Sequence, residues 1–206
     1  MKSLLRLPST LLLTLTALLL AQSFSFGQAW APTQVAADIK DVNIIMQKTP
    51  QFDAQVSDSK KDGKRREYLE VEVEFETKSN SKIKIVPELM IQYYLAVKGI
   101  EQQVLTDSYR YRNIEDDEEA FSIVYVSPAS LTQIAGEKGK FKESDVVAWG
   151  VEILYKGRVV ATASSSGNKP WWTATNAQTT SGLMMPKEKT PFQLLWIDRH
   201  AETILD

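Results

Sequence analysis

Two adjacent tryptophans, Trp171 and Trp172, are the residues whose type and spacing most favour a binding function. They stand in the loop-like stretch Gly167–Thr175, which reads GNKPWWTAT. Indole rings bury a large apolar area with little conformational freedom, so the pair could form a platform for a sugar ring or bind a protein partner. Met184 and Met185 would add soft apolar surface if they are exposed. The alternative is that one indole ring caps the end of the fold and the other lies under the loop.

Catalytic chemistry has little support in the sequence. His200 is the one histidine, and a lone histidine near the end of a chain is expected to be a surface residue. The S-x-x-K pattern occurs at Ser57–Lys60 and Ser79–Lys82, but without S-D-N or K-T-G it is a chance match. We therefore expect no catalytic residue, no cofactor and no metal site. A hydrolase with two carboxylates stays open, because such a pair leaves no spacing signature.

An acidic run, Ile114–Ala120, reads IEDDEEA and could in principle bind a cation. Calcium loops alternate acidic residues with glycine and backbone carbonyls, and this run has no glycine. The run is therefore expected to be a solvated loop.

The stretch Tyr68–Thr77, YLEVEVEFET, alternates apolar and acidic residues with a period of two. Its acidic positions are Glu70, Glu72, Glu74 and Glu76. On a strand these carboxylates line one face while the apolar residues line the other, which predicts a half-buried strand. A hairpin turn would bring Lys82 and Lys84 onto the acidic face, so we expect a solvated, lysine-paired surface. The alternative is a docking face for a basic partner or a divalent cation.

Short extended segments fill most of the chain. Besides Tyr68–Thr77, the expected strands are Ile39–Gln47, Lys82–Val86, Glu88–Val97, Val104–Arg112, Ala120–Val126, Val146–Tyr155 and Arg158–Ser164. Ser127–Gly136 is the one expected helix, with Ser127 as its cap and Pro128 at its first position. Residues 165–190 are expected to be irregular. Because strands and helices do not alternate, the sequence predicts an all-β antiparallel sandwich of seven to eight strands.

The sequence supports separate predictions for the two ends of the chain. Residues 1–27 combine a basic start with the apolar run LLLTLTALLLA, which predicts a signal peptide, the alternative being a retained anchor helix. Residues 28–38 are expected to be a linker and 39–206 the folded domain. Removal of Lys2 and Arg6 makes the formal charge of −2 more negative, which argues against nucleic-acid or anionic-membrane partners. Near the C-terminus, Phe192 and Trp196 are expected to pin the chain to the body, and Trp149 to lie in the core.

Three features together resemble a known family: the secretion signal, the YLEVEVEF strand and the C-terminal TPFQLLWIDR. They resemble the small secreted immunoglobulin-like proteins of Verrucomicrobia-type bacteria that are described as pilus-like and encoded near type IV pilus genes. The resemblance spans most of Ile39–Arg199. It implies an immunoglobulin-like sandwich, export, and a structural role in surface assembly. The apolar run ends before the cleavage site, so assembly through a retained pilin helix is not expected.

These observations predict a non-enzymatic exported protein that is periplasmic, associated with the outer membrane or extracellular. Its partner would be a protein on the cell surface or a second copy of the chain, and the mature chain would have no membrane span. The contact would be made by the loop that carries Trp171 and Trp172 or by a free sheet edge. The alternative is a glycan-binding module that uses the same two tryptophans.

Overall fold

The computed structural model describes residues 34–50, 65–99, 102–136, 139–167, 169–174 and 178–205. The expected signal peptide and most of the expected linker lie outside these residues. The compact unit that contains the described residues spans Thr33–Asp206.

The first sheet has four strands in the order β1-β2-β5-β9, and all its neighbours are antiparallel. The strands are β1 Val35–Lys48, β2 Glu67–Ser79, β5 Glu119–Val126 and β9 Met184–Pro186. β1 therefore begins inside the stretch that the sequence suggested as a linker. It carries a bulge between Ile39 and Asp41, a feature that bends an edge strand and discourages further pairing.

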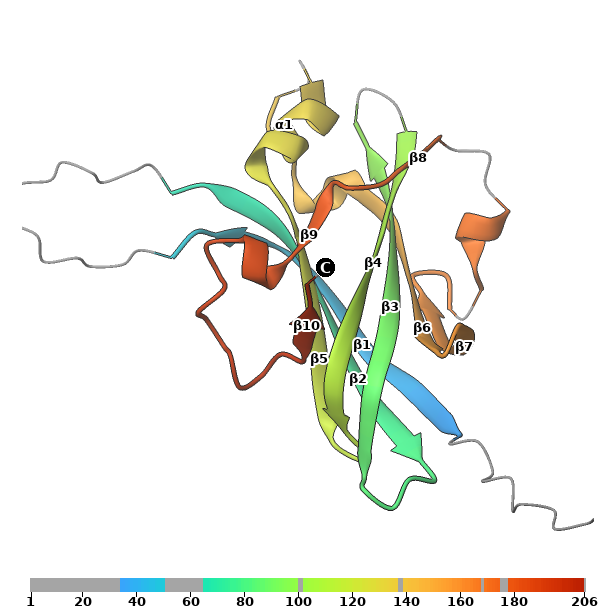
Figure 1. Ribbon diagram of the computed structural model, residues 1–206. Helices are drawn as coiled ribbons and strands as arrows, with labels where there is room; N and C mark the ends of the chain where they lie inside the picture. The colour runs from blue at the N-terminus through green and yellow to red at the C-terminus, as the bar shows by residue number, and fades with distance from the viewer. Residues whose placement is uncertain are drawn as a thin grey trace, which may run out of the picture. The chain divides into compact units, whose positions relative to one another are not determined.

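The second sheet has the order β10-β4-β3-β6-β7, with β8 added in parallel beside β4 (Figure 1). Its strands are β3 Ile85–Lys98, β4 Gln102–Glu115, β6 Val146–Tyr155, β7 Arg158–Ser164, β8 Gln178–Thr180 and β10 Glu202–Ile204. The all-β sandwich is confirmed. The described residues hold ten strands rather than seven to eight, because β8, β9 and β10 are three-residue strands that periodicity cannot detect.

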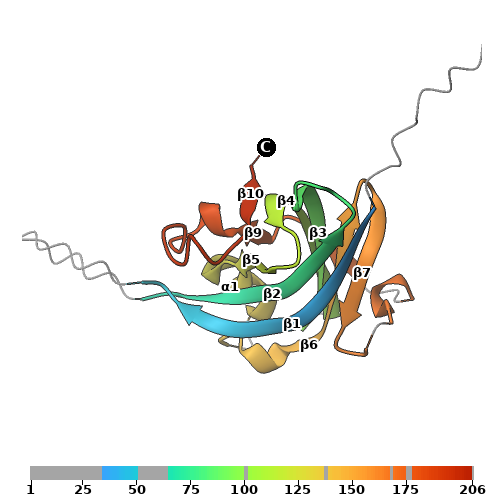
Figure 2. The ribbon, with the colours of Figure 1, turned by 90° about the horizontal axis from the view of Figure 1, so that it is seen from below.

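The core lies between the two sheets, and β2 contributes the row that the alternation predicted. Leu69, Val71, Val73 and Phe75 are all fully or almost fully buried. They pack in one apolar cluster with inward-facing residues of the second sheet such as Tyr93 and Ile153. Each such side chain contributes roughly 1.5–3 kcal/mol on burial. Figure 2 shows β1 and β7 side by side, where the edges of the two sheets approach each other.

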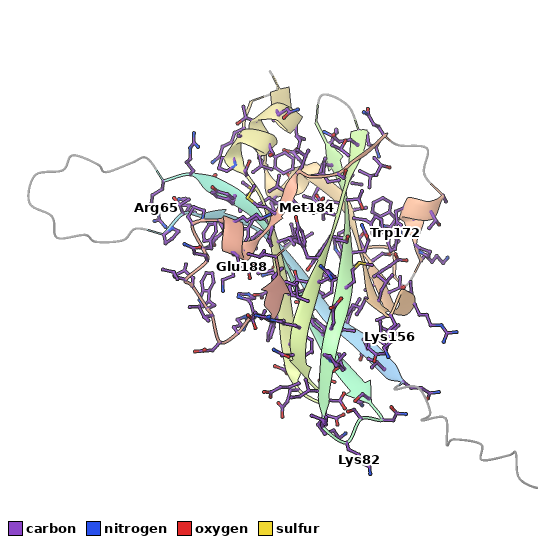
Figure 3. All side chains as sticks on the ribbon, viewed as in Figure 1. Arg65, Lys82, Lys156, Trp172, Met184 and Glu188 are labelled. Carbon is purple, nitrogen blue, oxygen red and sulfur yellow. The ribbon has the colours of Figure 1, made fainter. Side chains whose placement is uncertain are left out.

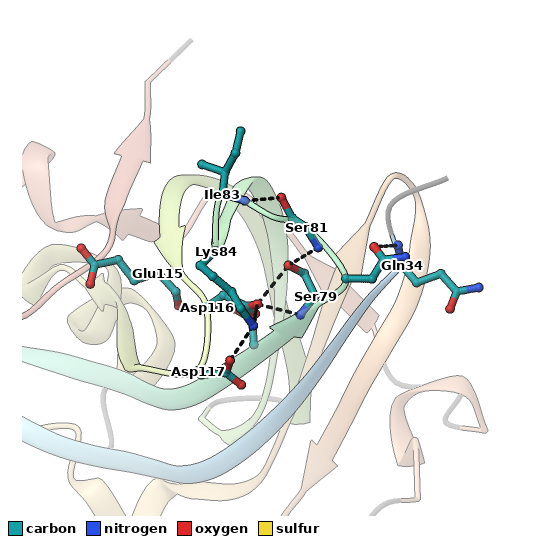
Figure 4. Close-up of polar contacts among 10 residues, drawn as sticks. Gln34, Ser79, Ser81, Ile83, Lys84, Glu115, Asp116 and Asp117 are labelled. Atoms are coloured by element: carbon teal, nitrogen blue, oxygen red, sulfur yellow. Dashed lines mark hydrogen bonds and ion pairs between the residues drawn. The ribbon is translucent and has the colours of Figure 1, made fainter. Parts of the chain in front are cut away.

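The connection from β2 to β3 does not form the expected hairpin. It crosses from the first sheet to the second, and the buried carboxylate of Asp116 holds it (Figure 4). Asp116 accepts hydrogen bonds from the backbone N–H and the hydroxyl of Ser79, both at 3.0 Å, and from Lys84 at 3.5 Å. Lys82 and Lys84 therefore do not pair with the glutamates of β2. The expectation that the whole acidic run is solvated is also wrong, because Asp116 is buried.

Pro87 lies within β3 instead of interrupting it. The strand pairs with β4 from Ile85 onward, but β6 joins its other edge only from Met90. A residue without an N–H group is tolerated at such an unpaired edge.

The local signals for the helix and the second hairpin are confirmed. α1 spans Pro128–Ala135, and the Ser127 hydroxyl accepts a hydrogen bond from the N–H of Ser130 at 3.1 Å. Lys156 and Gly157 join β6 to β7 with φ values of 50° and 75°. Two successive positive φ values are typical of the tight hairpin turn whose twist matches the flanking strands.

Candidate functional site

The C-terminal segment covers part of the outer face of the first sheet and is attached there by an aromatic cluster. The segment begins with the 3-10 turn η4, Lys187–Lys189. The ring of Phe192 is completely buried and stacks on Tyr125 of β5, with centroids 4.6 Å apart and planes 8° apart. Tyr68 of β2 meets the same ring edge-on at 5.3 Å. Phe192 therefore fixes the chain to the body, as the sequence indicated.

A polar contact attaches the same segment eight residues later. His200 Nε2 is 2.8 Å from Glu72 Oε2, and Arg199 donates to the other carboxylate oxygen at 2.9 Å. The guanidinium group of Arg199 also lies 3.8 Å from the centroid of the Phe121 ring, a favourable cation–π distance. The side chain of His200 is 4% exposed. The expectation of a surface histidine is wrong, because Glu72 gives the imidazole a buried partner.

Burial lowers the pKa of His200, and the charge of Lys187 lowers it further against the opposing hydrogen bond to Glu72. Burial also lowers the pKa of Lys187, whose Nζ lies 3.2 Å from His200 Nδ1. Nδ1 also lies 3.2 Å from the carbonyl oxygen of Trp196. A neutral imidazole donates from Nε2 to Glu72 and accepts at Nδ1 from Lys187, whereas a protonated one donates from Nδ1 to Trp196.

The four glutamates of β2 have different environments. Burial raises the pKa of Glu70, whose carboxylate lies beside the hydroxyl of Tyr125. Burial alone would raise the pKa of Glu72 as well, but hydrogen bonds from Arg199 and His200 outweigh it and lower the pKa. Glu76 pairs with Lys40 of β1 at 3.2 Å. The C-terminal segment thus covers part of the outer face of β2. The lysine that pairs with a glutamate of this face is Lys40, and not the expected Lys82 or Lys84.

Between these two attachments, residues 193–198 form what we call the C-terminal loop. It presents three large apolar side chains to solvent: Leu194 is 64% exposed, Trp196 48% and Ile197 61%. The carbonyl of Trp196 accepts the N–H groups of Arg199 and His200 at 3.1 and 3.3 Å. Trp196 has a φ of 50°, an uncommon conformation for a bulky residue. The loop is therefore held in a defined conformation with its apolar side chains outward, and Trp196 does not pin the terminus as expected.

The tryptophan pair occupies the 3-10 turn η3, Trp171–Thr173, against the outer face of the second sheet. The ring of Trp172 stacks on Tyr94 with centroids 4.5 Å apart, and it lies directly over Gly150. Trp171 donates its Nε1–H to the carbonyl of Trp149 at 2.9 Å. The two indole planes are 86° apart and both side chains are half-buried, so the pair does not form one flat platform. Trp149 is half-buried and packs against the core.

Met184 does not offer the surface that the sequence suggested. Its side chain is 2% exposed and belongs to the main core, because β9 pairs with β5 and turns it inward. Met185 is half-buried and packs against the cluster of Tyr125 and Phe192. Figure 3 shows that Trp172 and Glu188, which precedes the C-terminal loop, lie on different sides of the sandwich. The structure therefore does not gather the four suggested contact residues into one site.

Sequence reasoning missed Leu194, Ile197 and the Glu72–His200 contact. The run QLLWID carried a signal, since it places apolar residues at 194–197 without strand alternation. Within the described ranges, no group of three or more histidine, cysteine or acidic residues could hold a metal ion. In the same ranges, no helix has the length and apolar character needed to cross a bilayer.

Fold and site together define a β-sandwich protein whose most prominent feature is an ordered, exposed apolar loop. Residues 28–204 match the model of one protein family, and the chain belongs to that family. The chain is also similar to a protein of Akkermansia muciniphila whose crystal structure is known, with a TM-score of 0.74 and 25% sequence identity. That similarity covers 85% of this chain and 96% of the other. None of the curated proteins matches the chain.

Proposed function

We propose that the protein is a non-enzymatic structural or interaction protein that is exported and works by contact in an assembly on the cell surface, such as a pilus-associated one. The observation that carries this proposal is the C-terminal loop, with three large apolar side chains in solvent. The family membership and the likeness to the Akkermansia muciniphila protein are consistent with a structural role.

The C-terminal loop has the properties of a protein-binding element. Single exposed apolar residues are ordinary on a protein surface, but Leu194, Trp196 and Ile197 fall within four positions of one ordered loop. Tryptophan is among the residues that contribute most to binding when a partner covers them. Because Phe192 and Arg199 already fix the ends of the loop, little conformational entropy remains to be lost on binding.

Site-specific crosslinking in the cells that make the protein tests the proposal. A photoreactive amino acid replaces Trp196, and the matched control places it at Val159, an apolar residue of similar exposure at the start of β7. We expect position 196 to give a discrete adduct with an envelope protein or a second copy, which position 159 does not give. The same adduct pattern at both positions, or recovery of the protein only from the cytoplasm, would contradict the proposal.

Glycan binding by Trp171 and Trp172 is the second candidate. It is favoured by hydrogen-bonding side chains on the outer face around the Trp172 ring, where the Tyr94 hydroxyl donates to Glu152 at 3.0 Å. Binding of an oligosaccharide there would shift the tryptophan fluorescence, and a Trp171→Ala/Trp172→Ala variant would lose the shift. A panel of mucin-type and plant oligosaccharides that leaves the fluorescence unchanged would remove this candidate.

A further inference from the structure

A pocket of about 600 Å³ lies at the end of the sandwich where β1, β2 and α1 meet. Figure 3 marks its position through Arg65. The volume falls within the roughly 300–1,000 Å³ that small-molecule sites occupy. Neither the C-terminal loop nor the tryptophan pair contributes to its lining.

The inner part of the pocket is apolar. Met46 of β1, Leu131 of α1 and Phe141 line it. Leu131 and Phe141 belong to the main core, and Met46 packs against that core while it remains half-buried. These side chains present a fixed apolar wall, because core packing holds two of the three in place.

The outer part of the pocket is basic. Lys140 and Glu67 form an ion pair and compensate each other. The Nε–H of Arg65 donates to the carbonyl of Thr49 at 2.9 Å, which fixes the side chain and leaves its two terminal nitrogens for a ligand. The backbone N–H of Arg66 donates to the Thr49 hydroxyl at 3.1 Å. Within the residues that the structure describes, the guanidinium group of Arg66 has no hydrogen bond or ion pair.

The charge balance of the lining residues that the structure describes is therefore positive. Arg65 and Arg66 remain among its described lining residues after the Lys140–Glu67 pair is set aside. The N-terminal end of α1 at Pro128 and Ala129 also lines the pocket, and the helix dipole adds partial positive charge there. Arginine matches the planar, bidentate geometry of carboxylate and phosphate oxygens.

We propose that this pocket binds an anionic amphiphile, with a carboxylate or phosphate head group at Arg65 and Arg66 and an alkyl chain against Met46, Leu131 and Phe141. The inference is independent of the proposed function, because the two sites share no residue. A solvated arginine pair binds free anions weakly, so the head group alone is not sufficient. The alkyl chain adds about fourfold in affinity for each methylene that it buries.

Calorimetric titration of the purified protein tests this, with decyl phosphate and decanoate below their critical micelle concentrations. Inorganic phosphate provides the head group alone and decyl maltoside the chain with a neutral head. We expect saturable one-to-one binding of both anionic amphiphiles, at least about tenfold tighter than either partial ligand, and weaker binding as salt increases. Equal binding of decyl maltoside, or no saturable binding of decyl phosphate and decanoate, would overturn the proposal.

Variants locate the site. Arg66→Glu should weaken decyl phosphate binding at least about tenfold, whereas Arg158→Glu, the same charge change on an exposed residue of β7, should leave it unchanged. Met46→Ser should weaken binding of decyl phosphate more than that of inorganic phosphate, and its unfolding curve shows whether the fold survives. Equal effects of Arg66→Glu and Arg158→Glu would show that any binding depends on net charge alone and would refute the pocket.

Discussion

Glu72 and His200 stand 128 residues apart in the sequence, and the carboxylate of the one lies 2.8 Å from the imidazole Nε2 of the other. This contact joins β2 to the end of the C-terminal segment. The next backbone N–H, that of Ala201, donates to the carbonyl of Phe121 at 2.7 Å. The segment is therefore tied to both central strands of the first sheet, and the apolar loop before it takes its conformation from that attachment.

Replacement of Glu72 by alanine should destabilise the C-terminal segment. It leaves the buried imidazole of His200 without its carboxylate partner, and an unpaired buried polar group costs roughly 1–3 kcal/mol. Urea unfolding measures the loss, and hydrogen exchange should show faster exchange at residues 192–201. Glu74→Ala is the matched control, since Glu74 lies on the same face of β2 and is half-buried. A Glu72→Ala variant with unchanged exchange in this segment would contradict the assigned role.

His200 should make the stability of the protein depend on pH. Its pKa is lowered by burial below the ordinary value of 6.5, so the unfolded chain takes up a proton more readily than the folded protein. The free energy of unfolding should therefore decrease as the pH falls below about 6.5. Urea midpoints between pH 7.5 and 5.5 measure the slope, and His200→Gln should flatten it. Burial raises the pKa of Glu70, which makes the free energy of unfolding increase as the pH falls. This contribution is the same in the unchanged protein and in the His200→Gln variant. Identical slopes would show that the histidine does not titrate as described.

Local patterns predicted the parts of the fold that depend on neighbouring residues. The strand at Tyr68–Thr77 and the helix capped by Ser127 follow from alternation and capping within ten residues. Local patterns did not predict which sheet each strand joins, because the crossover after Ser79 depends on Asp116, 37 residues later. A turn sequence does not reveal whether the next strand pairs with the last one or enters another sheet.

The candidate site was less predictable for the same reason. Alternation correctly placed the glutamates of β2 on one face, but nothing near Glu72 in the sequence indicates that His200 will cover it. The sequence alone does not distinguish Trp196 from Phe192, because both are large aromatic residues in the same apolar stretch. Only the stacking of Phe192 on Tyr125 separates the buried ring from the exposed one.

Phe192 and Leu194 should differ sharply in their contribution to stability. Phe192→Ala removes a completely buried ring that stacks on Tyr125, and such a change costs about 3–5 kcal/mol. Leu194→Ala removes a side chain that is mostly in solvent, so its effect should stay within about 0.5 kcal/mol. Urea denaturation of both variants measures the difference. A large loss for Leu194→Ala would show that the C-terminal loop is packed rather than presented.

Gly150 should be required for the position of the Trp172 ring. A Cβ atom at Gly150 would lie 2.0 Å from a ring carbon of Trp172, which no side chain tolerates. Gly150→Ala should therefore displace the indole from Tyr94, shift its fluorescence to longer wavelength and lower the stability by about 1–3 kcal/mol. In a Trp172→Ala background the same substitution should cost little, because the clashing ring is absent. This double-mutant cycle separates the contact from any intrinsic strand effect of the glycine. Equal costs in the two backgrounds would place the Trp172 ring away from Gly150 in solution.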